Sequence, residues 1–337
     1  MDPVCRKVRV RVAATSANLG SGFDTVGLAL SYFDELEFTL SADPLNTAAQ
    51  VIIDGEGADT LPRDESHLVV ATFRRACEKL GLGKLGFILE AHNRIPQARG
   101  MGSSAEAIVA GIAAAYGFAR EADLDRDFTF ALAAELEGHP DNVAPAVYGG
   151  MTVSWTDSAD PLPDGEATHP AYRTACYAVA DDLTATVYVP DYELSTAKAR
   201  EALPAQVPFA DAVFDVSRAA LLMGAMNPAM LAGSAADDAG DGDADAAANA
   251  LLLTATDDRL HQPYRGPLMQ PSADLIRRMR AAGYAACVSG AGPCVLVLHH
   301  GDARAELDAV AVDELESGHW QSLHLPIDTG GVQVERG

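Results

Sequence analysis

Residues 95 to 111, IPQARGMGSSAEAIVAG, place two glycines and two serines at the start of an Ala-rich stretch with helical periodicity. Glycines allow a backbone to turn its N–H groups inward, and a helix beginning near Ser104 presents the positive end of its dipole. Hydroxyls in the first turn of a helix either cap the helix or bind a magnesium ion. The segment therefore predicts a phosphate-binding loop, with a helix cap and no ligand as the alternative.

Two familiar phosphate-binding patterns do not fit this segment. A dinucleotide-binding GxGxxA turn directly follows a strand, whereas about ten residues, including Pro96, separate Glu90 from Gly102. The next segment, DFTFALAAELEG, is also helical in pattern, so no βαβ unit is formed. A Walker A loop is excluded because neither Lys-Ser nor Lys-Thr follows the glycines.

Two further stretches share the same character. ATSANLGSGFDTVGLAL, residues 14 to 30, carries Asn18, Asp24 and several glycines in a predicted loop directly after the first strand. VSGAGPCVLVL, residues 288 to 298, has a glycine-rich turn that leads into an apolar strand. Packing alone does not explain three such turns with polar groups, so the set favours a ligand site.

These turns must be positioned by a mixed set of strands and helices. Alternating or apolar patterns predict strands at 8–15, 34–42 and 87–92, and 3.6-residue periodicity predicts helices at 66–80, 103–116 and 126–137. The polar, proline-bearing residues 156–169 indicate a domain boundary. Beyond it, we expect two strands in 175–190, helices at 195–202, 210–226 and 271–282, a strand at 287–300, a helix at 302–315 and a strand at 322–328. This alternation predicts an α+β second domain with an antiparallel sheet.

The composition limits the class of protein. The 48 acidic residues against 24 basic ones give a net charge of −24, which disfavours nucleic acids and anionic membranes as partners. The acidity is spread along the chain and only four lysines occur, a balance that suggests a halophilic cytoplasm at molar salt rather than an acidic mesophilic protein. Five scattered cysteines without a CxxC pair argue against a disulfide framework and a zinc site. Without an apolar span or signal core, we expect a soluble cytoplasmic protein.

Residues 232–250 form an acidic low-complexity insertion. Its DGDAD sequence resembles the first half of a calcium loop, but it lacks the glycine expected at the sixth position and has Leu252 where the twelfth-position glutamate should be. We therefore interpret the insertion as solvated and disordered.

Taken together, the three glycine-rich stretches resemble the signature motifs of the kinase superfamily that contains galactokinase, homoserine kinase, mevalonate kinase and phosphomevalonate kinase. This resemblance implies an N-terminal domain, residues 1–160, like the second domain of ribosomal protein S5 with a left-handed βαβ crossover, and a ferredoxin-like domain, residues 161–337. ATP would lie along the glycine loop. The residues matched to ATP binding are Pro96, Arg99, Gly100, Met101, Gly102, Ser103, Ser104, Ala105 and, near the adenine, His67.

EGHPDNVAPAVYGG, residues 137–150, and RGMGSSAEAIVAGI are similar to the forms that these segments take in homoserine kinases. The similarity implies ATP-dependent phosphorylation of the L-homoserine hydroxyl for threonine synthesis, and a homodimer. The matched arginines would hold the substrate carboxylate, a task suited to the guanidinium fork, and an aspartate would suit its ammonium. The implied substrate residues are Asn18, Asp24, Thr196, Arg200, Arg265 and Gly292.

The resemblance also assigns the metal and the transfer step. Ser104 and Glu137 would bind Mg²⁺ through hard oxygen donors, with Glu135 as the rival carboxylate. Asn142 would position the substrate, whereas a role for Asp141 as a base stays open, since phosphoryl transfer depends mainly on positioning and charge neutralisation. We expect His139 to order this turn.

Three residues depart from the family pattern. His67 stands where an Asn is common, Glu106 where a small residue is usual, and Asp215 where an Asn is frequent. Two rival interpretations follow: a sibling kinase acting on mevalonate or shikimate, and a non-catalytic protein that keeps the fold. Intact glycines and an intact metal carboxylate argue against the second of these.

Overall fold

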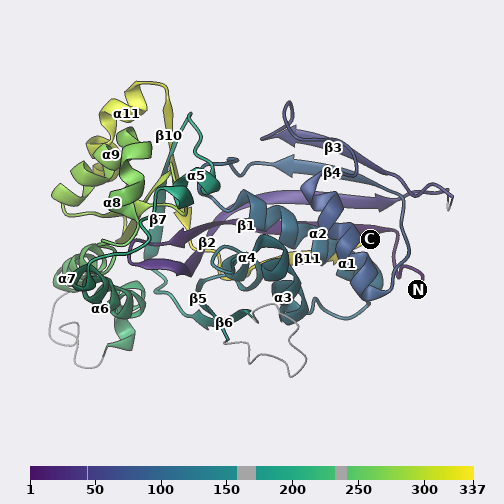
Figure 1. The fold of residues 1–337 in the computed structure, drawn as a ribbon, viewed down its shortest axis with the longest axis horizontal. Helices are drawn as coiled ribbons and strands as arrows, with labels where there is room; N and C mark the ends of the chain where they lie inside the picture. The colour runs from purple at the N-terminus through teal and green to yellow at the C-terminus, as the bar shows by residue number, and fades with distance from the viewer. Residues whose placement is uncertain (44, 158–171, 232–240) are drawn as a thin grey trace.

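The structure is a computed structural model that describes residues 1–43, 45–157, 172–231 and 241–337. Its first layer is a seven-stranded sheet with the order β11-β1-β2-β4-β3, extended from β2 through β5 to β6 (Figure 1). Only β3 and β4 run parallel, and helix α1 connects them, so they form a β-α-β unit. The strands are β1 (Lys7–Asn18), β2 (Gly22–Leu40), β3 (Ala49–Gly55), β4 (Phe87–Asn93), β5 (Met151–Thr156), β6 (Tyr172–Tyr177) and β11 (Gln333–Arg336).

Helices α1 to α4 cover one face of this sheet and bury its main apolar core. Helix α2 is the central one: its Ala- and Gly-rich sequence lets it pack closely against its neighbours, and nearly all of its residues are buried. The long buried helix is therefore held rigidly, with its N-terminus directed at the loop that precedes it. The helices are α1 (Leu68–Leu80), α2 (Ser103–Ala119), α3 (Arg126–Glu137) and α4 (Val143–Tyr148).

The second sheet is antiparallel and has the order β10-β7-β9-β8. Counted along the chain this order is 4-1-3-2, the ferredoxin-like arrangement, so the expected two-part α+β fold is confirmed. Its strands are β7 (Leu183–Pro190), β8 (Ala285–Val288), β9 (Val295–His300) and β10 (Trp320–Pro326). Its helices are α5 (Thr196–Glu201), α6 (Phe209–Met226), α7 (Asp241–Ala255), α8 (Gln262–Arg265), α9 (Gln270–Ala281), α10 (Arg304–Val310) and α11 (Val312–Glu316).

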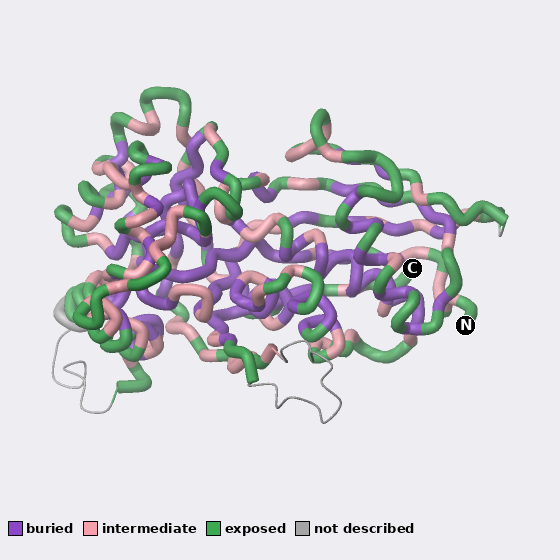
Figure 2. Tube along the Cα trace, viewed as in Figure 1, coloured by how far each residue is buried: buried purple, intermediate pink, exposed green. Residues whose placement is uncertain are grey.

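The two sheets share an apolar core in which Leu28 and Leu30 of β2 pack with Val187 of β7. Figure 2 shows buried chain running through both parts of the molecule. Strands β6 and β11 join the first sheet although they follow the division expected at residue 160, and that point itself lies outside the described residues. No helix in the described ranges is long and apolar enough to cross a membrane.

Several sequence expectations were wrong in detail. Helix α7 occupies residues that we interpreted as disordered, because apolar residues such as Leu252 and Ala255 dock on the core at its C-terminal end; residues 232–240 lie outside the described part. The loop expected at 14–30 is a short turn between β1 and β2. The strand expected at 287–300 is the β8–β9 hairpin, and the helix expected at 302–315 is divided into α10 and α11.

Candidate active site

The three glycine-rich stretches, far apart in sequence, meet at one place. The Ser289 hydroxyl lies 2.6 Å from the Gly100 carbonyl oxygen, and the Cys294 amide donates to the Arg99 carbonyl at 3.0 Å. The Gly290 amide donates to the carbonyl oxygen of Ala17, at the end of β1, at 3.1 Å. The sequence interpretation of these turns as parts of one site is therefore supported by direct contacts.

The glycine loop ends at the N-terminus of α2. Gly102 is the N-cap residue with φ 74°, and a Cβ at this position would lie 1.9 Å from Thr15 Oγ1, so only glycine fits. No described side chain accepts a hydrogen bond as a cap of this helix, and the Ser104 hydroxyl instead donates to Glu137 at 2.7 Å. The first N–H groups of α2 and the positive end of its dipole are thus directed at a cleft, as an anion-binding helix requires.

The cleft has a volume of about 450 Å³ and lies between the glycine loop, β2, α5 and the turn after β8. Most predicted site residues line it: Asn18, Asp24, His67, Gly100, Gly102, Ser103, Ser104, Glu137, Asp141, Asn142, Thr196, Arg200 and Arg265.

Five predicted residues lie around the cleft without lining it. Pro96 and Arg99 line a separate hollow beside Asp191, where the Arg99 guanidinium donates to the Asp191 carbonyl. Met101 and Ala105 are fully buried supports of the loop. The fifth, Gly292, has φ 84° and lies against the Met269 side chain.

At one end of the cleft, Arg200 of α5 and Asp24 of β2 form a bidentate ion pair, with N–O distances of 2.9 and 3.1 Å. Asp24 has φ 53°, a conformation that an L-residue adopts only when its surroundings impose it. Asn18 supplies that constraint, since its Oδ1 accepts from the Asp24 amide at 2.9 Å and its Nδ2 donates to the Gly290 carbonyl at 2.7 Å. The Asn18 side chain therefore shapes this end of the cleft.

Arg265, the second predicted arginine, is only 2% exposed. Its Nη1 donates to the Gly290 carbonyl and to His261 Nδ1, each at 3.3 Å. Phe23 covers the guanidinium at 5.1 Å from its ring centroid. A buried guanidinium that still lines a cleft offers a positive charge in a poorly hydrated place, which strengthens its attraction for a carboxylate.

A second polar chain lies beside the N-terminus of α2. Glu137, next to the Ser104 hydroxyl, lines the cleft, whereas Glu135 is exposed and lies outside it. His139 Nδ1 is 2.7 Å from Asp141, and this carboxylate raises the pKa of His139. Asp141 also accepts from the Asn142 amide at 3.0 Å, so it is held by two donors.

Asn142 is oriented by Thr15 of β1. The Thr15 hydroxyl donates to Asn142 Oδ1 at 2.9 Å, which directs the amide nitrogen of Asn142 away from β1. Because Asn142 is the N-cap of α4 and lines the cleft, it presents a donor at a fixed place between the glycine loop and the Asp24–Arg200 pair. Such a donor can orient a ligand hydroxyl.

Three buried polar groups also line the cleft: His67, Glu106 and Asp34. Neither ring nitrogen of His67, nor Glu106 Oε1, has a hydrogen-bond partner among the described residues. Burial lowers the pKa of His67 and raises that of Asp34 to about 6; burial and the neighbouring Asp34 raise the pKa of Glu106 well above its ordinary value. The raised pKa favours the protonated form of Glu106, which can then donate to Asp34.

Sequence reasoning missed Asp34 as part of this cleft. Its side chain lies on the buried face of β2 together with Leu36 and Phe38, and it accepts the Arg94 and Ile95 amides at 2.5 and 2.9 Å. A charged residue in phase with buried apolar positions of a strand is a signal that could have identified it.

Comparisons with known proteins agree with this geometry. The family models described as GHMP kinases N terminal domain and GHMP kinases C terminal match residues 67–150 and 230–315. A homoserine kinase of Clavibacter michiganensis subsp. michiganensis is 41% identical over 331 residues, 98% of this chain and 94% of the relative. One from Cutibacterium acnes is 44% identical over 307 residues, 90% of this chain and 92% of the relative.

A solved structure has the same fold. The homoserine kinase of Cytophaga hutchinsonii superposes with a TM-score of 0.77 at 24% identity, covering 99% of both chains. The mevalonate diphosphate decarboxylase of Staphylococcus aureus, at 15% identity and a TM-score of 0.61, shares the fold over 98% of this chain and of its own. With relatives above 40% identity over nearly its whole length, this chain belongs to the homoserine kinase family of the GHMP kinases.

Proposed function

We propose that this chain transfers the γ-phosphoryl group of ATP to the side-chain hydroxyl of L-homoserine, giving O-phospho-L-homoserine for threonine synthesis. The observation that carries the proposal is that one cleft contains both an open helix N-terminus and an Asp24–Arg200–Arg265 group. The first suits a polyphosphate, and the second suits an amino acid, with a carboxylate and an ammonium to bind.

For the nucleotide, the phosphates would lie on the backbone of residues 100–105 and the base at the opposite end of the cleft. There, the unpaired nitrogens of His67 and the unpaired Oε1 of Glu106 are free to hydrogen-bond with a base or ribose. Pro96, Arg99, Met101 and Ala105 would act indirectly by fixing the loop, since they do not line the cleft.

For the acceptor, Arg200 and Arg265 would hold the carboxylate, with Thr196 beside them and Gly292 keeping the adjoining turn in place. Asp24 would take the ammonium, and Asn142 would orient the hydroxyl. The bidentate pair of Asp24 and Arg200 must open for this, and an exposed ion pair contributes only about 0–1 kcal/mol, so the substrate can replace it readily.

The transfer step is proposed to rely on positioning. Asp141 already accepts from His139 and from the Asn142 amide, so it serves to hold Asn142 rather than to take a proton from the acceptor. The hydroxyl proton is lost late in a loose phosphoryl-transfer transition state, which makes a dedicated base unnecessary.

The residues present fit Mg²⁺ at one place. The Ser104 hydroxyl and the Glu137 carboxylate are hard oxygen donors 2.7 Å apart beside the helix N-terminus. Among the described residues, no group of three or more His, Cys, Asp or Glu is arranged to hold a metal, which agrees with an ion that takes its other ligands from water and phosphate. Bound there, Mg²⁺ would neutralise phosphate charge during the transfer.

The proposed setting is a cytoplasm at molar salt, with the enzyme as a homodimer. The net charge of −24 supports the salt requirement, because it produces strong self-repulsion that salt screens. The homodimer is proposed from the resemblance to homoserine kinases alone.

The test is ATP turnover with Mg²⁺ in molar potassium chloride, with L-homoserine, mevalonate, shikimate and L-threonine as acceptors. The proposal predicts a kcat/KM for L-homoserine at least about a hundredfold above the others, because mevalonate and shikimate lack the ammonium and L-threonine carries its hydroxyl one carbon closer to the α-carbon. Preference for mevalonate or shikimate would keep the kinase and overturn the substrate.

A further inference from the structure

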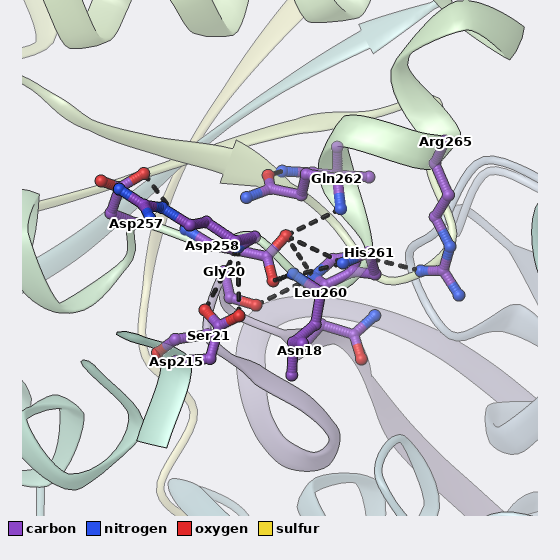
Figure 3. Close-up of polar contacts among 12 residues, drawn as sticks. Asn18, Gly20, Ser21, Asp215, Asp257, Asp258, Leu260, His261, Gln262 and Arg265 are labelled. Carbon is purple, nitrogen blue, oxygen red and sulfur yellow. Dashed lines mark hydrogen bonds and ion pairs between the residues drawn. The ribbon is translucent and has the colours of Figure 1, made fainter. Parts of the chain in front are cut away.

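Arg265 is held by a network that does not itself line the cleft (Figure 3). His261, one helical turn before Arg265, is fully buried and touches the guanidinium through its ring: Arg265 Nη1 lies 3.3 Å from His261 Nδ1. The opposite ring nitrogen, Nε2, lies 2.8 Å from the Gly20 carbonyl oxygen. His261 therefore bridges the turn between β1 and β2 to the arginine.

These two contacts fix where the imidazole carries its proton. A guanidinium has donors and no acceptor, so the hydrogen bond to Arg265 requires a free lone pair on Nδ1. On the other side, Nε2 faces two acceptors, the Gly20 carbonyl oxygen and, at 3.5 Å, an oxygen of Asp258. The hydrogen-bond pattern is satisfied by neutral imidazole with its proton on Nε2 and by no other form.

The His261 ring and the backbone that carries it are also held in place. Phe23 stacks on it with ring centroids 5.0 Å apart and an interplanar angle of 21°, and the same Phe23 covers Arg265. Asp258 accepts from the backbone amides of Leu260, His261 and Gln262, which fixes the start of α8. Gln262 then accepts from the Val288 amide at 2.7 Å and so ties α8 to the sheet.

We propose that His261 is the positioning residue for the carboxylate-binding arginine: as neutral imidazole it holds the Arg265 guanidinium at the cleft wall, and when protonated it releases it. A proton on Nδ1 would face Arg265 with a second positive charge and remove its acceptor. The inference rests on the proposed function, since Arg265 must bind the substrate carboxylate for His261 to matter. Its consequence is acid-sensitive homoserine binding with unaltered ATP binding.

The surroundings determine at which pH this happens. Burial lowers the pKa of His261 and outweighs the negative charge of Asp258, which acts in the other direction. The imidazole therefore stays neutral at and above neutral pH, and protonation belongs to the acid side of its ordinary range. Other charged groups also act on this network: Arg265 and Asp24 of β2 on His261 itself, Arg200 of α5 and Asp141 through Arg265, and Asp215 of α6 through Asp258.

Two amide variants, each of which reproduces one polar position of the imidazole, separate positioning from general packing. In His261→Gln the amide nitrogen can still donate toward Gly20, but the acceptor for Arg265 is lost. In His261→Asn an amide oxygen can take the place of Nδ1, and it does not titrate. KM and kcat for homoserine and KM for ATP would be measured from about pH 5.5 to 8.5, alongside the melting temperature and the Arg265→Ala variant.

The expected result is that His261→Gln raises the homoserine KM about tenfold above wild type at neutral pH, with no further rise at acid pH and with ATP KM unchanged, because a hydrogen bond to a charged group is lost. His261→Asn should restore the homoserine KM at neutral pH and abolish its rise at acid pH. The homoserine KM of the wild type should rise at acid pH, and that of Arg265→Ala should not. This comparison of wild type with Arg265→Ala tests the inference even if the His261 variants do not fold.

Two results would overturn the inference. If Arg265→Ala raises the homoserine KM but a folded His261→Gln does not, Arg265 binds substrate and His261 does not position it. If Arg265→Ala leaves the homoserine KM unchanged, the proposed carboxylate site itself is wrong, and the inference fails with it.

Discussion

Arg200 Nη1 and Nη2 bind Asp24 Oδ2 and Oδ1 at 2.9 and 3.1 Å, so the two groups proposed to bind the carboxylate and the ammonium of the substrate neutralise each other. A zwitterionic amino acid presents the same two charges in reverse. It can therefore insert between them, exchanging one ion pair for two. Without substrate, Asp24 and Arg200 thus compensate each other's charge, so Asp24 adds no uncompensated negative charge to a chain whose net charge is −24.

Replacing Arg200 with lysine keeps the charge and removes the planar fork. The Arg200→Lys variant should raise the homoserine KM about tenfold or more while ATP KM changes by less than about twofold, because a lysine cannot bind a carboxylate through two parallel hydrogen bonds. Steady-state kinetics with each substrate varied measures this. Arg277→Lys, at an exposed arginine outside the cleft, is the matched control. Equal effects of both variants would refute the clamp.

Variants of the two glutamates near the end of α3, Glu135 and Glu137, distinguish an effect on metal binding from an effect of surface charge. Glu137→Gln should lower kcat about a hundredfold and raise the Mg²⁺ concentration needed for half-maximal rate, because a charged oxygen ligand next to Ser104 is lost. Glu135→Gln, at an exposed carboxylate outside the cleft, should leave both unchanged. A Mg²⁺ titration of the two variants decides the matter, and the opposite outcome would assign the metal to Glu135.

The glycine loop admits no side chain at Gly102. Gly102→Ala should abolish tight ATP binding and lower the free energy of unfolding, because the residue has φ 74° and its Cβ would lie 1.9 Å from Thr15 Oγ1. Gly81, the C-cap of α1, has φ 77° with open space around its Cβ position, so Gly81→Ala carries only the backbone strain, about 1–2 kcal/mol. Denaturant unfolding and ATP titration compare them; equal losses in both would contradict the close fit at Gly102.

Because of the Glu106–Asp34 pair, we expect the free energy of unfolding to fall as the pH rises from acid to neutral. Burial raises the pKa of both carboxyls, so the folded chain holds more protons than the unfolded chain at pH values above about 4. The free energy of unfolding contributed by this pair is therefore present at low pH and declines as the pH rises through about 6, the pKa of Asp34.

Glu106→Gln keeps a donor to Asp34 and cannot ionise. It should remove part of that pH dependence between about pH 5 and pH 8 and be more stable than wild type at the upper end, because its amide carries no carboxylate charge into the buried site. Denaturant unfolding at both pH values measures the difference. Glu121→Gln, at an exposed carboxylate, is the control, and an unchanged slope in Glu106→Gln would show that the buried pair does not titrate in this range.

The sequence allowed the main elements and most of the cleft to be predicted because both depend on local signals. Helix periodicity gave α1, α2 and α3 within a few residues, and Gly, Ser and Asn mark the turns that bring ligands and backbone together. Arg200 and Arg265 could be named because their sequence context matches that of homoserine kinases. These predictions needed no long-range contact.

What could not be predicted depends on contacts between distant residues. The Asp24–Arg200 pair joins residues 176 positions apart, and the contact of His261 with Gly20 spans 241. Helix α7 forms in a low-complexity sequence that we expected to be disordered, because its apolar end packs on a core formed by other segments. Strand β11 joins the first sheet by pairing with β1, which no local pattern indicates.

The central claim is tested most directly by phosphorus NMR of a reaction that contains the enzyme, ATP, Mg²⁺ and L-homoserine in molar potassium chloride. We predict one new phosphomonoester signal, coupled to the side-chain methylene protons of homoserine, that grows in equal amount with ADP. Release of free phosphate with ADP, or ADP formation that does not depend on homoserine, would contradict it.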